Sequence, residues 1–569
     1  MNRYENAFAA AVARAAGVDE AEIRDHLKTP EEERGDLSFP CFPLAKRLRS
    51  APPKIAASIV ERLEPSPLFS SVEAVGPYVN ARVSAAHLMA TVAPEIRALG
   101  EVFAGSSLGG GAYVVIDYSS PNIAKPLGFH HLRSTMIGNA LARIHRALGY
   151  RVAGVNFLGD WGKTFGILAE AFRRFGDRAR LEAEGIAYLL ELYVAANKIL
   201  AEDPAFDAAA RAMFRAQEDG DVEALELWRA FRDVSLAEFK RVYDRLGVSF
   251  EHIEGESFYR HGLDAVIDEV RRTVGTREDQ GALVVDMPYA EGEPPMMLRK
   301  SDGATLYATR DIAAAVDRFE RFAFAKSLYV VGVEQKLHFE QLKRALAAMG
   351  HAWADRMTHA YFGRIHGMST RKGNVVFLSD VLDEAKERAV AKMREASDER
   401  VAALEEVAEQ VGVGGVVFGD LKNLRTTDYS FDWEEILNTK GFTGICVQYA
   451  HARCCSILRK GGGAPAPADV DWSLLTAPEE IALVKEVARI PGAVVAAAAE
   501  LEPSRLARAA YEAARAWNRY QQVGNADRGL RVLCEDARLQ AARLALVDAA
   551  RIGLKRGLDL LGVPAPEAM

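Results

Sequence analysis

A short apolar run leads into a polar loop whose residues could bind phosphate. Residues 112–118 are rich in β-branched and aromatic side chains, which predicts a buried strand. Proline and small polar residues at 119–122 cannot continue this strand, and apolar residues recur at helical spacing from Leu132 to Leu148. The loop before the expected helix contains Lys125, Gly128, His130 and His131. Because the first N–H groups of a helix are unpaired and attract anions, a cation and two imidazoles beside them suit the phosphates of a nucleotide.

A second strand is expected at 152–155, followed by a polar segment at 156–162. The order strand, helix, strand predicts an α/β fold with a parallel sheet, whose ligands bind at the carboxyl ends of the strands. Periodicity alone favours an ordinary α/β core with a few exposed polar residues. The identity of the polar residues is more informative than their spacing.

Three segments closely resemble the catalytic core of the arginyl-tRNA synthetases, a family of class I aminoacyl-tRNA synthetases. They are SSPNIAKP at 119–126, HLRST at 131–135 and NFLGDWG at 156–162. The resemblance continues through most of the chain and is strongest at 117–166 and 302–376. It implies a class I, Rossmann-like catalytic domain built on a parallel sheet.

Length and composition set independent bounds. A chain of 569 residues is too long for one core and suggests about three or four domains. It contains no apolar run of membrane-spanning length, no secretory h-region at its start and no CxxC pair among five cysteines, so we expect a cytoplasmic protein with no membrane association and no metal site. The net charge of −8 gives no reason to expect DNA binding, and RNA contacts would need local basic surfaces.

The resemblance divides the chain into three parts. An N-terminal α+β domain at 1–107 would contact the elbow of a tRNA. The Rossmann-like catalytic domain would span 108–378, with a helical insertion at about 165–293. An all-α stem-contact and anticodon-binding bundle would occupy 379–569, and we expect a monomer.

A second polar group, around Tyr307 and Asp311, precedes an expected strand at 328–333 that ends near Gln335. A guanidinium offers five donors in a plane, so its pocket needs a carboxylate and neutral acceptors. Taken alone, Asp311 would more often be a surface or capping acid. The resemblance instead implies an arginine pocket made of Ser120, Asn122, Asn156, Tyr307, Asp311 and Gln335.

Both nucleotide-binding signatures of the class depart from their usual form. The pattern His-x-Gly-His reads GFHH at 128–131, so only His131 aligns, and His130 either replaces the lost histidine or obstructs ATP. The pattern Lys-Met-Ser-Lys-Ser reads GMSTR at 367–371, without either lysine. Lys125 and Lys372 could supply the missing charge, since position along the chain matters less than distance from the phosphates. The expected ATP-binding residues are Gly128, His130, His131, Met368, Ser369, Arg371 and Lys372, and Lys125, His131 and Lys372 are the expected catalytic groups.

Two further groups are candidates for tRNA contact. Tyr78 and Asn80 would share one face of a strand, offering a ring for stacking beside an amide that can read a base edge. Arg515, Trp517 and Tyr520 lie in a segment rich in arginine and aromatic residues, which suits single-stranded RNA. Packing in the core is an equally good explanation for the rings of Tyr78, Trp517 and Tyr520.

The implied activity is the ATP-dependent attachment of L-arginine to tRNA(Arg), with Mg²⁺ accompanying ATP. One alternative is a catalytically impaired paralogue that binds tRNA or regulates, suggested by the two altered signatures. Another is a class I synthetase for a different amino acid, which an acidic pocket disfavours because a neutral side chain would leave the carboxylate unpaired.

Overall fold

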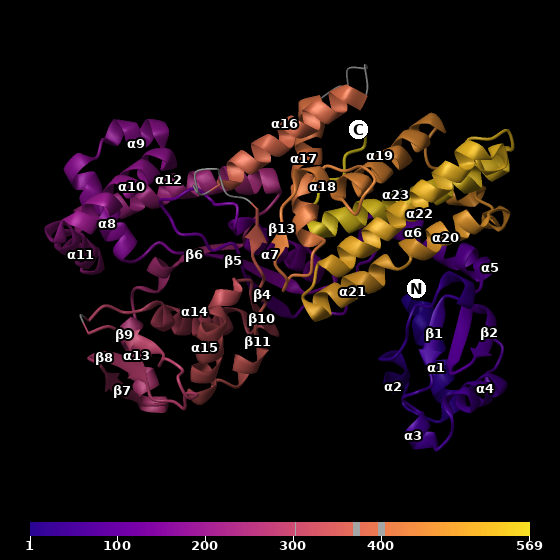
Figure 1. Cartoon of the computed structure of the whole chain (residues 1–569), viewed down its shortest axis with the longest axis horizontal. Coiled ribbons are helices and arrows are strands. Elements are labelled where there is room, and N and C mark those ends of the chain that lie inside the picture. Colours follow the sequence, from indigo (N-terminus) through magenta and orange to yellow (C-terminus); the bar gives the residue numbers. More distant parts are fainter. Residues whose placement is uncertain (302, 368–375, 397–403) are drawn as a thin grey trace.

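A five-stranded parallel sheet forms the centre of the catalytic domain (Figure 1). The computed structural model describes residues 1–301, 303–367, 376–396 and 404–569. The sheet has the order β11-β10-β4-β5-β6. Its strands are β4 (Tyr113–Asp117), β5 (Arg151–Leu158), β6 (His252–Gly255), β10 (Lys326–Tyr329) and β11 (Met357–His359). The expected parallel α/β fold is therefore confirmed, with β4 between β10 and β5.

Helices cover both faces of this sheet. Alternate residues of β4 enter different cores: Val114 and Ile116 pack with α7 (His131–Ala147), whereas Val115 packs with α14 (Tyr307–Phe322) and α15 (Lys336–Ala348). A strand buried on both sides must be apolar at every position, which is why 113–116 reads as a continuous hydrophobic run. The loops at the strands' carboxyl ends are thereby fixed on a rigid base.

The segment expected to be one helical insertion contains two different insertions. The first is helical: α8 (Lys163–Phe175), α9 (Arg178–Glu184), α10 (Ile186–Glu202), α11 (Pro204–Glu218) and α12 (Val222–Leu246). Strand β6 then returns to the main sheet, and α13 (Leu263–Thr273) precedes a three-stranded antiparallel sheet of β7 (Thr276–Asp279), β8 (Ala282–Val285) and β9 (Met297–Arg299). The prediction of helix throughout 165–293 was wrong here, because short strands at an edge carry a weak periodic signal.

The N-terminal domain has the expected α+β composition. Its antiparallel sheet has the order β1-β3-β2 and packs against two helices. These elements are α1 (Asn2–Ala16), β1 (Leu37–Pro40), α4 (Pro52–Arg62), β2 (Phe69–Val75) and β3 (Tyr78–Val83), with short α2 (Glu20–Arg24) and α3 (Ala45–Leu48) between them. The domain lies below the C-terminal helices in Figure 1. It is joined to the catalytic domain through α5 (Ala85–His87) and α6 (Ala93–Leu99).

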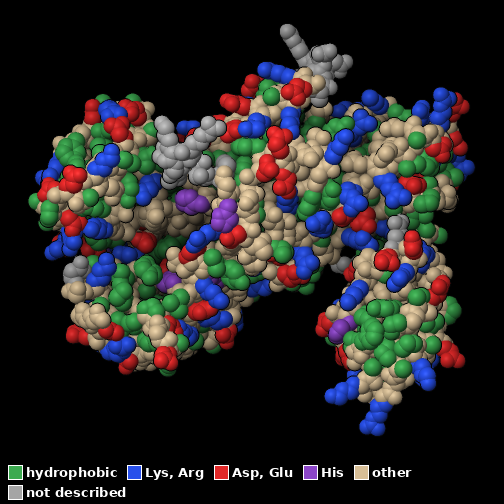
Figure 2. Space-filling model, in the orientation of Figure 1, with side chains coloured by type: hydrophobic (Ala, Val, Ile, Leu, Met, Phe, Trp, Pro, Cys, Tyr) green, Lys and Arg blue, Asp and Glu red, His purple; other side chains and the backbone are tan. Residues whose placement is uncertain are grey.

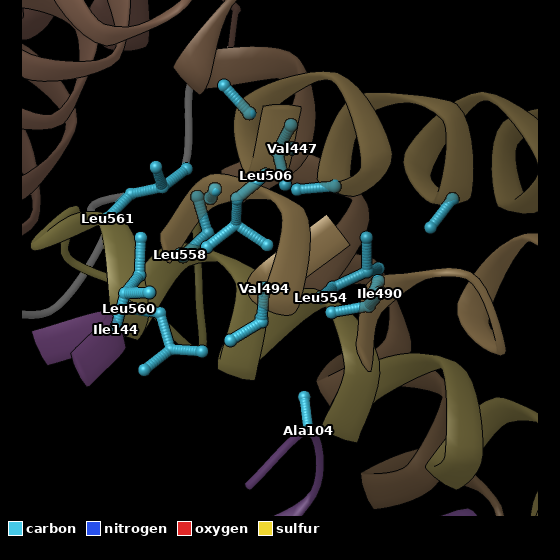
Figure 3. Close-up of a cluster of buried hydrophobic side chains, with 14 of the residues drawn as sticks. Ala104, Ile144, Val447, Ile490, Val494, Leu506, Leu554, Leu558, Leu560 and Leu561 are labelled. Carbon is cyan, nitrogen blue, oxygen red and sulfur yellow. The ribbon is translucent and has the colours of Figure 1, made fainter. Parts of the chain in front are cut away.

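The C-terminal part is a helical bundle that shares its core with the catalytic domain. Its helices are α16 (Leu378–Ala396), α17 (Leu404–Leu421), α18 (Trp433–Ile436), α19 (Gly444–Lys460), α20 (Pro478–Val487), α21 (Ile490–Glu500), α22 (Ser504–Ala526) and α23 (Ala537–Leu561). Figure 3 shows Leu560 and Leu561 of α23 close to Ile144 of α7. No helix within the described ranges is long and apolar enough to cross a membrane.

Candidate functional site

The loop after β4 lies at the carboxyl end of the sheet, facing a hollow between two lobes. Figure 2 shows histidine side chains gathered in this hollow, between the lobe of α8–α12 and the lobe below it. Ser119 and Ser120 both have left-handed backbone conformations, with φ of 70° and 47°. Consecutive non-glycine residues rarely adopt this conformation, so surrounding contacts must hold the loop.

Helix α7 supplies several of those contacts. The N–H of Ser119 donates to Ser134 Oγ at 2.9 Å, and the hydroxyls of Ser119 and Thr135 lie 2.8 Å apart. Ser134 Oγ in turn donates to the carbonyl of Val330, just after β10. The HLRST segment therefore ties the strained loop to the central strands.

His131 begins α7 and is the imidazole best placed to meet a nucleotide. Its Nδ1 lies 3.0 Å from the N–H and 3.1 Å from the carbonyl oxygen of Gly128, so Gly128 occupies this nitrogen in either tautomer. Desolvation, followed by the neighbouring His130, lowers the pKa of His131 to about 4. The ring is therefore neutral at pH 7, and Nε2 is the nitrogen left for a ligand. The His130 ring lies against it at an interplanar angle of 37°, with centroids 4.1 Å apart, and is itself exposed, so it does not fill interior space.

Lys125 lies over the ring of Tyr193 from the insertion helix α10, with Nζ 4.0 Å from the ring centroid. A cation is attracted to the face of an aromatic ring, so this contact limits where the ammonium group moves. The insertion thus reaches the loop that the sequence marked as phosphate-binding.

Met368, Ser369, Arg371 and Lys372 lie outside the described residues. The described chain resumes beside the first signature: Phe129 N–H donates to Val376 O at 2.8 Å, and Leu378 N–H donates to Leu127 O at 2.8 Å. Before the gap, β12 (Ile365–His366) pairs in parallel with β13 (Tyr429–Ser430). The described chain that follows the gap, from Val376 to Leu378, is therefore adjacent to the first signature.

Two expected arginine-binding residues, Ser120 and Asn156, are held by the protein itself. Ser120 Oγ donates to Asp117 Oδ1 at 2.7 Å, and its N–H donates to Asn156 Oδ1 at 3.1 Å. Asn156 is fully buried and also donates to the hydroxyl of Tyr243 at 3.2 Å. Asp117 Oδ2 forms a buried ion pair with Arg318 at 2.8 Å. This part of the site is preorganised, with its carboxylate already paired.

Asp311 is differently placed. It lies in the first turns of α14, and its Oδ2 is 2.6 Å from Nε2 of His338 in α15. Tyr307 is half-exposed and packs edge-on against the same imidazole, with ring centroids 4.9 Å apart. Gln335 is exposed just before α15 and only three residues from His338. The structure brings Tyr307 and Asp311 together through a histidine that the sequence interpretation did not include.

A small cavity of about 170 Å³ lies between the two strand-end loops. Asn122 and Gly159 form one side, where the Asn122 amide oxygen sits so close to Gly159 that a Cβ there would meet it at 1.8 Å. On the other side burial raises the pKa of Glu256 to about 7, although Arg310 lies 3.6 Å away and opposes the shift. Asn122 therefore opens onto a partly acidic space.

The expected RNA-contacting rings of α22 are in the core. Trp517 and Tyr520 are fully buried, so neither can stack on a base, and that prediction was wrong for both. Core packing, the other interpretation, explains them. Arg515 is on the opposite face of the helix and lines a cleft of about 1330 Å³ between the bundle and the N-terminal domain. Tyr449 and Tyr511 also line this cleft and are the rings available there.

In the N-terminal sheet, Tyr78 is partly exposed and packs edge-on against Phe42. Asn80 is buried, and its Oδ1 has no hydrogen-bond partner among the described residues. The two side chains do share one strand, β3, but only the tyrosine reaches the surface.

Asp117 and His338 were missed by sequence interpretation, and each left a signal. Asp117 is an acid ending a buried strand, where the ligands of parallel sheets bind. His338 lies three residues after Gln335, a spacing that brings the first turn of α15 next to the residue that precedes the helix. No signal in the sequence marked Tyr193, because an aromatic residue in an amphipathic helix usually packs in the core.

Comparison with known proteins identifies the family. Residues 101–433 match the family described as "tRNA synthetases class I (R), catalytic domain", residues 2–83 match "Arginyl tRNA synthetase N terminal domain", and residues 447–569 match "DALR anticodon binding domain". The chain is 44% identical to an arginine–tRNA ligase of Lactococcus lactis, covering 99% of this chain and 98% of the relative. It is 45% identical to one of Streptococcus equi, covering 97% of each.

A solved structure of Thermus thermophilus arginyl-tRNA synthetase has a similar fold, with a TM-score of 0.80 at 27% identity and 99% coverage of both chains. The strained loop, the helix that holds it and the parallel sheet beneath thus occur in a chain whose full length matches these relatives. The protein belongs to the arginyl-tRNA synthetase family of class I aminoacyl-tRNA synthetases.

Proposed function

We propose that this protein activates L-arginine with ATP and transfers it to the 3′ end of tRNA(Arg). The observation that supports this most is the presence of two chemically different groups at the same end of the sheet. One is the neutral His131 at the start of α7, and the other is the carboxylate of Asp311 beside Tyr307. The first suits phosphate and the second suits a guanidinium.

The reaction has two steps. An oxygen of the arginine carboxylate attacks the α-phosphorus of ATP, the bond to the β-phosphate oxygen breaks, and pyrophosphate leaves. A ribose hydroxyl at the tRNA 3′ end then attacks the carbonyl carbon of the adenylate, the bond from that carbon to the phosphate oxygen breaks, AMP leaves, and the hydroxyl proton passes to water. No nucleophile of the enzyme is needed, so positioning and charge stabilisation carry the rate.

In this proposal Lys125 and His131 contact the phosphates. His131 donates a hydrogen bond from Nε2, and Lys125 neutralises charge that builds on the leaving pyrophosphate. We propose that Gly128 and His130 also contact ATP, and the resemblance implies the same role for Met368, Ser369, Arg371 and Lys372, which lie outside the described residues. The ATP substrate brings Mg²⁺ with its phosphates; no group of three His, Cys, Asp or Glu able to hold a metal was found in the part of the chain that the structure describes.

The arginine substrate would lie between Asp311 at its side-chain end and Asn122 at its other end. Asp311 and Gln335 take the guanidinium with Tyr307 against it, and Asn122 faces the backbone end of the amino acid. Ser120 and Asn156 act by holding the loop and Asp117 in place, because their polar atoms already bond to the protein. An arginine side chain bound by a carboxylate is discriminated from neutral amino acids by the cost of an unpaired buried charge.

The tRNA would run across the cleft between the bundle and the N-terminal domain. Arg515 supplies a cation there, and Tyr78 of β3 contacts the elbow, whereas Asn80 is buried and cannot take the role expected from the sequence. The groups proposed for ATP and arginine all come from one chain, so a monomer suffices. The five cysteines are free, which suits the reducing cytoplasm.

Charging of total tRNA with radiolabelled arginine tests this function, and the Asp311→Asn variant tests the pocket. We expect the unmodified protein to charge tRNA with arginine and Asp311→Asn to lower kcat/KM for arginine by more than about tenfold, since the guanidinium loses its countercharge. The KM for ATP should change little.

Asp317→Asn is a matched control, because Asp317 lies on the same helix but pairs with Arg321 at 2.9 Å. Absence of any arginine charging would leave the impaired, tRNA-binding alternative. Charging with normal arginine kinetics in Asp311→Asn would remove Asp311 from the pocket.

A further inference from the structure

The carboxylate of Asp311 is held by an imidazole. Nε2 of His338 lies 2.6 Å from Oδ2 of Asp311, and the two side chains are only 10% and 22% exposed. This distance is that of a hydrogen bond with a charged partner. The contact joins α14 to α15 at the carboxyl end of the sheet.

Aromatic rings fix the orientation of His338. Tyr307 packs edge-on at a centroid distance of 4.9 Å, and Phe339 lies at 5.2 Å and an interplanar angle of 69°. Phe339 itself packs on Tyr329 of β10 and His359 of β11. The imidazole is therefore held by side chains that pack on the sheet, and not by contacts with solvent.

Neighbouring acids are paired differently. Asp117 is paired with Arg318 at 2.8 Å, Glu254 with Arg321 at 2.6 Å, and Glu256 faces Arg310 at 3.6 Å. An arginine partner is always charged and cancels the charge of the acid. A histidine can donate the same hydrogen bond while neutral, so it can fix a carboxylate without cancelling its charge.

We propose that His338 is the residue that positions Asp311 for arginine specificity. Its Nε2–H holds Oδ2, so that Oδ1 faces the pocket with its negative charge available to the guanidinium. The inference rests on the proposed function, because it takes Asp311 as the arginine-binding acid. A permanent cation at position 338 would occupy the carboxylate in place of the substrate, whereas a histidine can donate the hydrogen bond without carrying a charge.

Substitutions at His338 separate hydrogen bonding from charge. His338→Gln supplies a neutral donor at the same position and should leave KM for arginine within about threefold of the unmodified enzyme. His338→Ala should raise this KM about tenfold with little change in kcat, since the carboxylate loses its support. His338→Lys should raise it by about a hundredfold or more, because a fixed cation competes with the substrate.

The measurements are KM for arginine, KM for ATP and kcat in arginylation by the full-length enzyme with saturating tRNA. His359→Gln is the matched control: His359 also packs against Phe339 but bonds to Val331 O instead of Asp311. KM for ATP and the thermal midpoint identify variants that are only misfolded. The double variant Asp311→Asn/His338→Ala should be no worse for arginine than Asp311→Asn, because the histidine acts through the aspartate.

The outcomes are distinguishable from failure of the proposed function. If Asp311→Asn raises KM for arginine while His338→Ala and His338→Lys leave it unchanged, the pocket stands and the role of His338 is overturned. A lower KM in His338→Ala would also overturn it, since His338 would then be a competitor that arginine displaces. Unchanged kinetics in Asp311→Asn would remove the pocket and this inference together.

Discussion

The first residues of α7 show how individual side chains divide the work of the site. His131 faces the proposed phosphate space, Ser134 and Thr135 hold the strained loop, and Arg133 turns the other way. Arg133 is buried, donates to the carbonyls of Gly363 and Thr427 at 2.9 Å, and pairs with Asp420 of α17 at 3.1 Å. Neighbouring residues of one motif thus have three different roles: binding the substrate, holding the loop and attaching the C-terminal bundle.

Further along α7, His145 makes the stability of the protein sensitive to acid. The side chain is fully buried, Nδ1 bonds to Leu141 O, and burial lowers its pKa from 6.5 to about 4. An unfolded chain therefore takes up a proton that the folded protein excludes, so stability is complete above pH 6.5 and is lost as pH falls toward 4. At pH 5 this group alone should cost about 2 kcal/mol of unfolding free energy relative to pH 7.

The His145→Asn variant should reduce this loss, whatever its stability at pH 7, because the asparagine does not titrate. Thermal unfolding midpoints at pH 5 and pH 7 for both proteins are the measurement. An equal fall in midpoint for the two proteins would contradict the assignment to His145.

The role of a residue could be predicted from the sequence where a motif specifies its chemistry. It could be predicted less well where the role depends on whether the side chain is buried. The loop from Ser119 to His131 was placed correctly at the carboxyl end of β4. Trp517 and Tyr520 were not, because aromatic and arginine residues interleaved on a helix look the same whether the rings face RNA or the core. The buried face of α22 is set by its packing against α20 and α23, which the residue pattern of α22 alone does not specify.

At the scale of elements, the first insertion contacts the nucleotide loop at three points. Tyr193 of α10 lies beneath Lys125, Ser235 of α12 accepts from Ala124 N–H at 2.8 Å, and Tyr243 of α12 lies 2.7 Å from Ser119 Oγ. Sequence periodicity predicted helices here but assigned them no chemistry. The contacts give the insertion a role in holding the loop.

Removal of the Tyr193 ring should therefore weaken catalysis modestly. We expect Tyr193→Leu to lower kcat for arginylation about two- to fivefold, the effect of one partly exposed cation–π contact. Tyr193→Phe keeps the ring and should match the unmodified enzyme. An effect of Tyr193→Leu that persists undiminished in a Lys125→Met background would show that the ring acts through something other than Lys125.

The β6 strand and the small sheet of β7–β9 show why the insertion boundary was misjudged. β6 has four residues at the edge of the main sheet and alternates only weakly between exposed and buried positions. Its membership in the sheet depends on pairing with β5, a contact that no local pattern of His252–Gly255 specifies.

At the scale of the whole molecule, one hydrophobic core runs through the N-terminal domain, one face of the catalytic sheet and the C-terminal bundle. Polar ties cross the same boundaries: Lys485 of α20 pairs with Asp36 at 2.7 Å, and Arg97 of α6 pairs with Asp548 of α23 at 3.0 Å. The three parts predicted from the sequence are therefore packed as one body rather than hinged on linkers.

Breaking the buried pair between Arg133 and Asp420 should loosen this body. Asp420→Asn leaves a buried guanidinium without its countercharge, which costs about 3 kcal/mol or more. We expect a lower thermal midpoint together with reduced kcat, because Arg133 also bonds to the carbonyls of Gly363 and Thr427, which flank β12 and β13. Asp428→Asn is a control at an exposed acid of the same region. A midpoint equal to that of the unmodified protein would show that the pair is not needed.

The position of Asp420 also governs how this enzyme could be recombined with its relatives. A chimaera spliced near residue 379 would take the guanidinium of Arg133 from one parent and two of its acceptors, the Asp420 carboxylate and the Thr427 carbonyl, from another. A splice between Ile436 and Gly444 keeps all of them from a single parent and cuts the chain where only a short connection joins α18 to α19. Exchange of anticodon modules at that crossover should therefore yield folded hybrids more often than exchange at the start of α16.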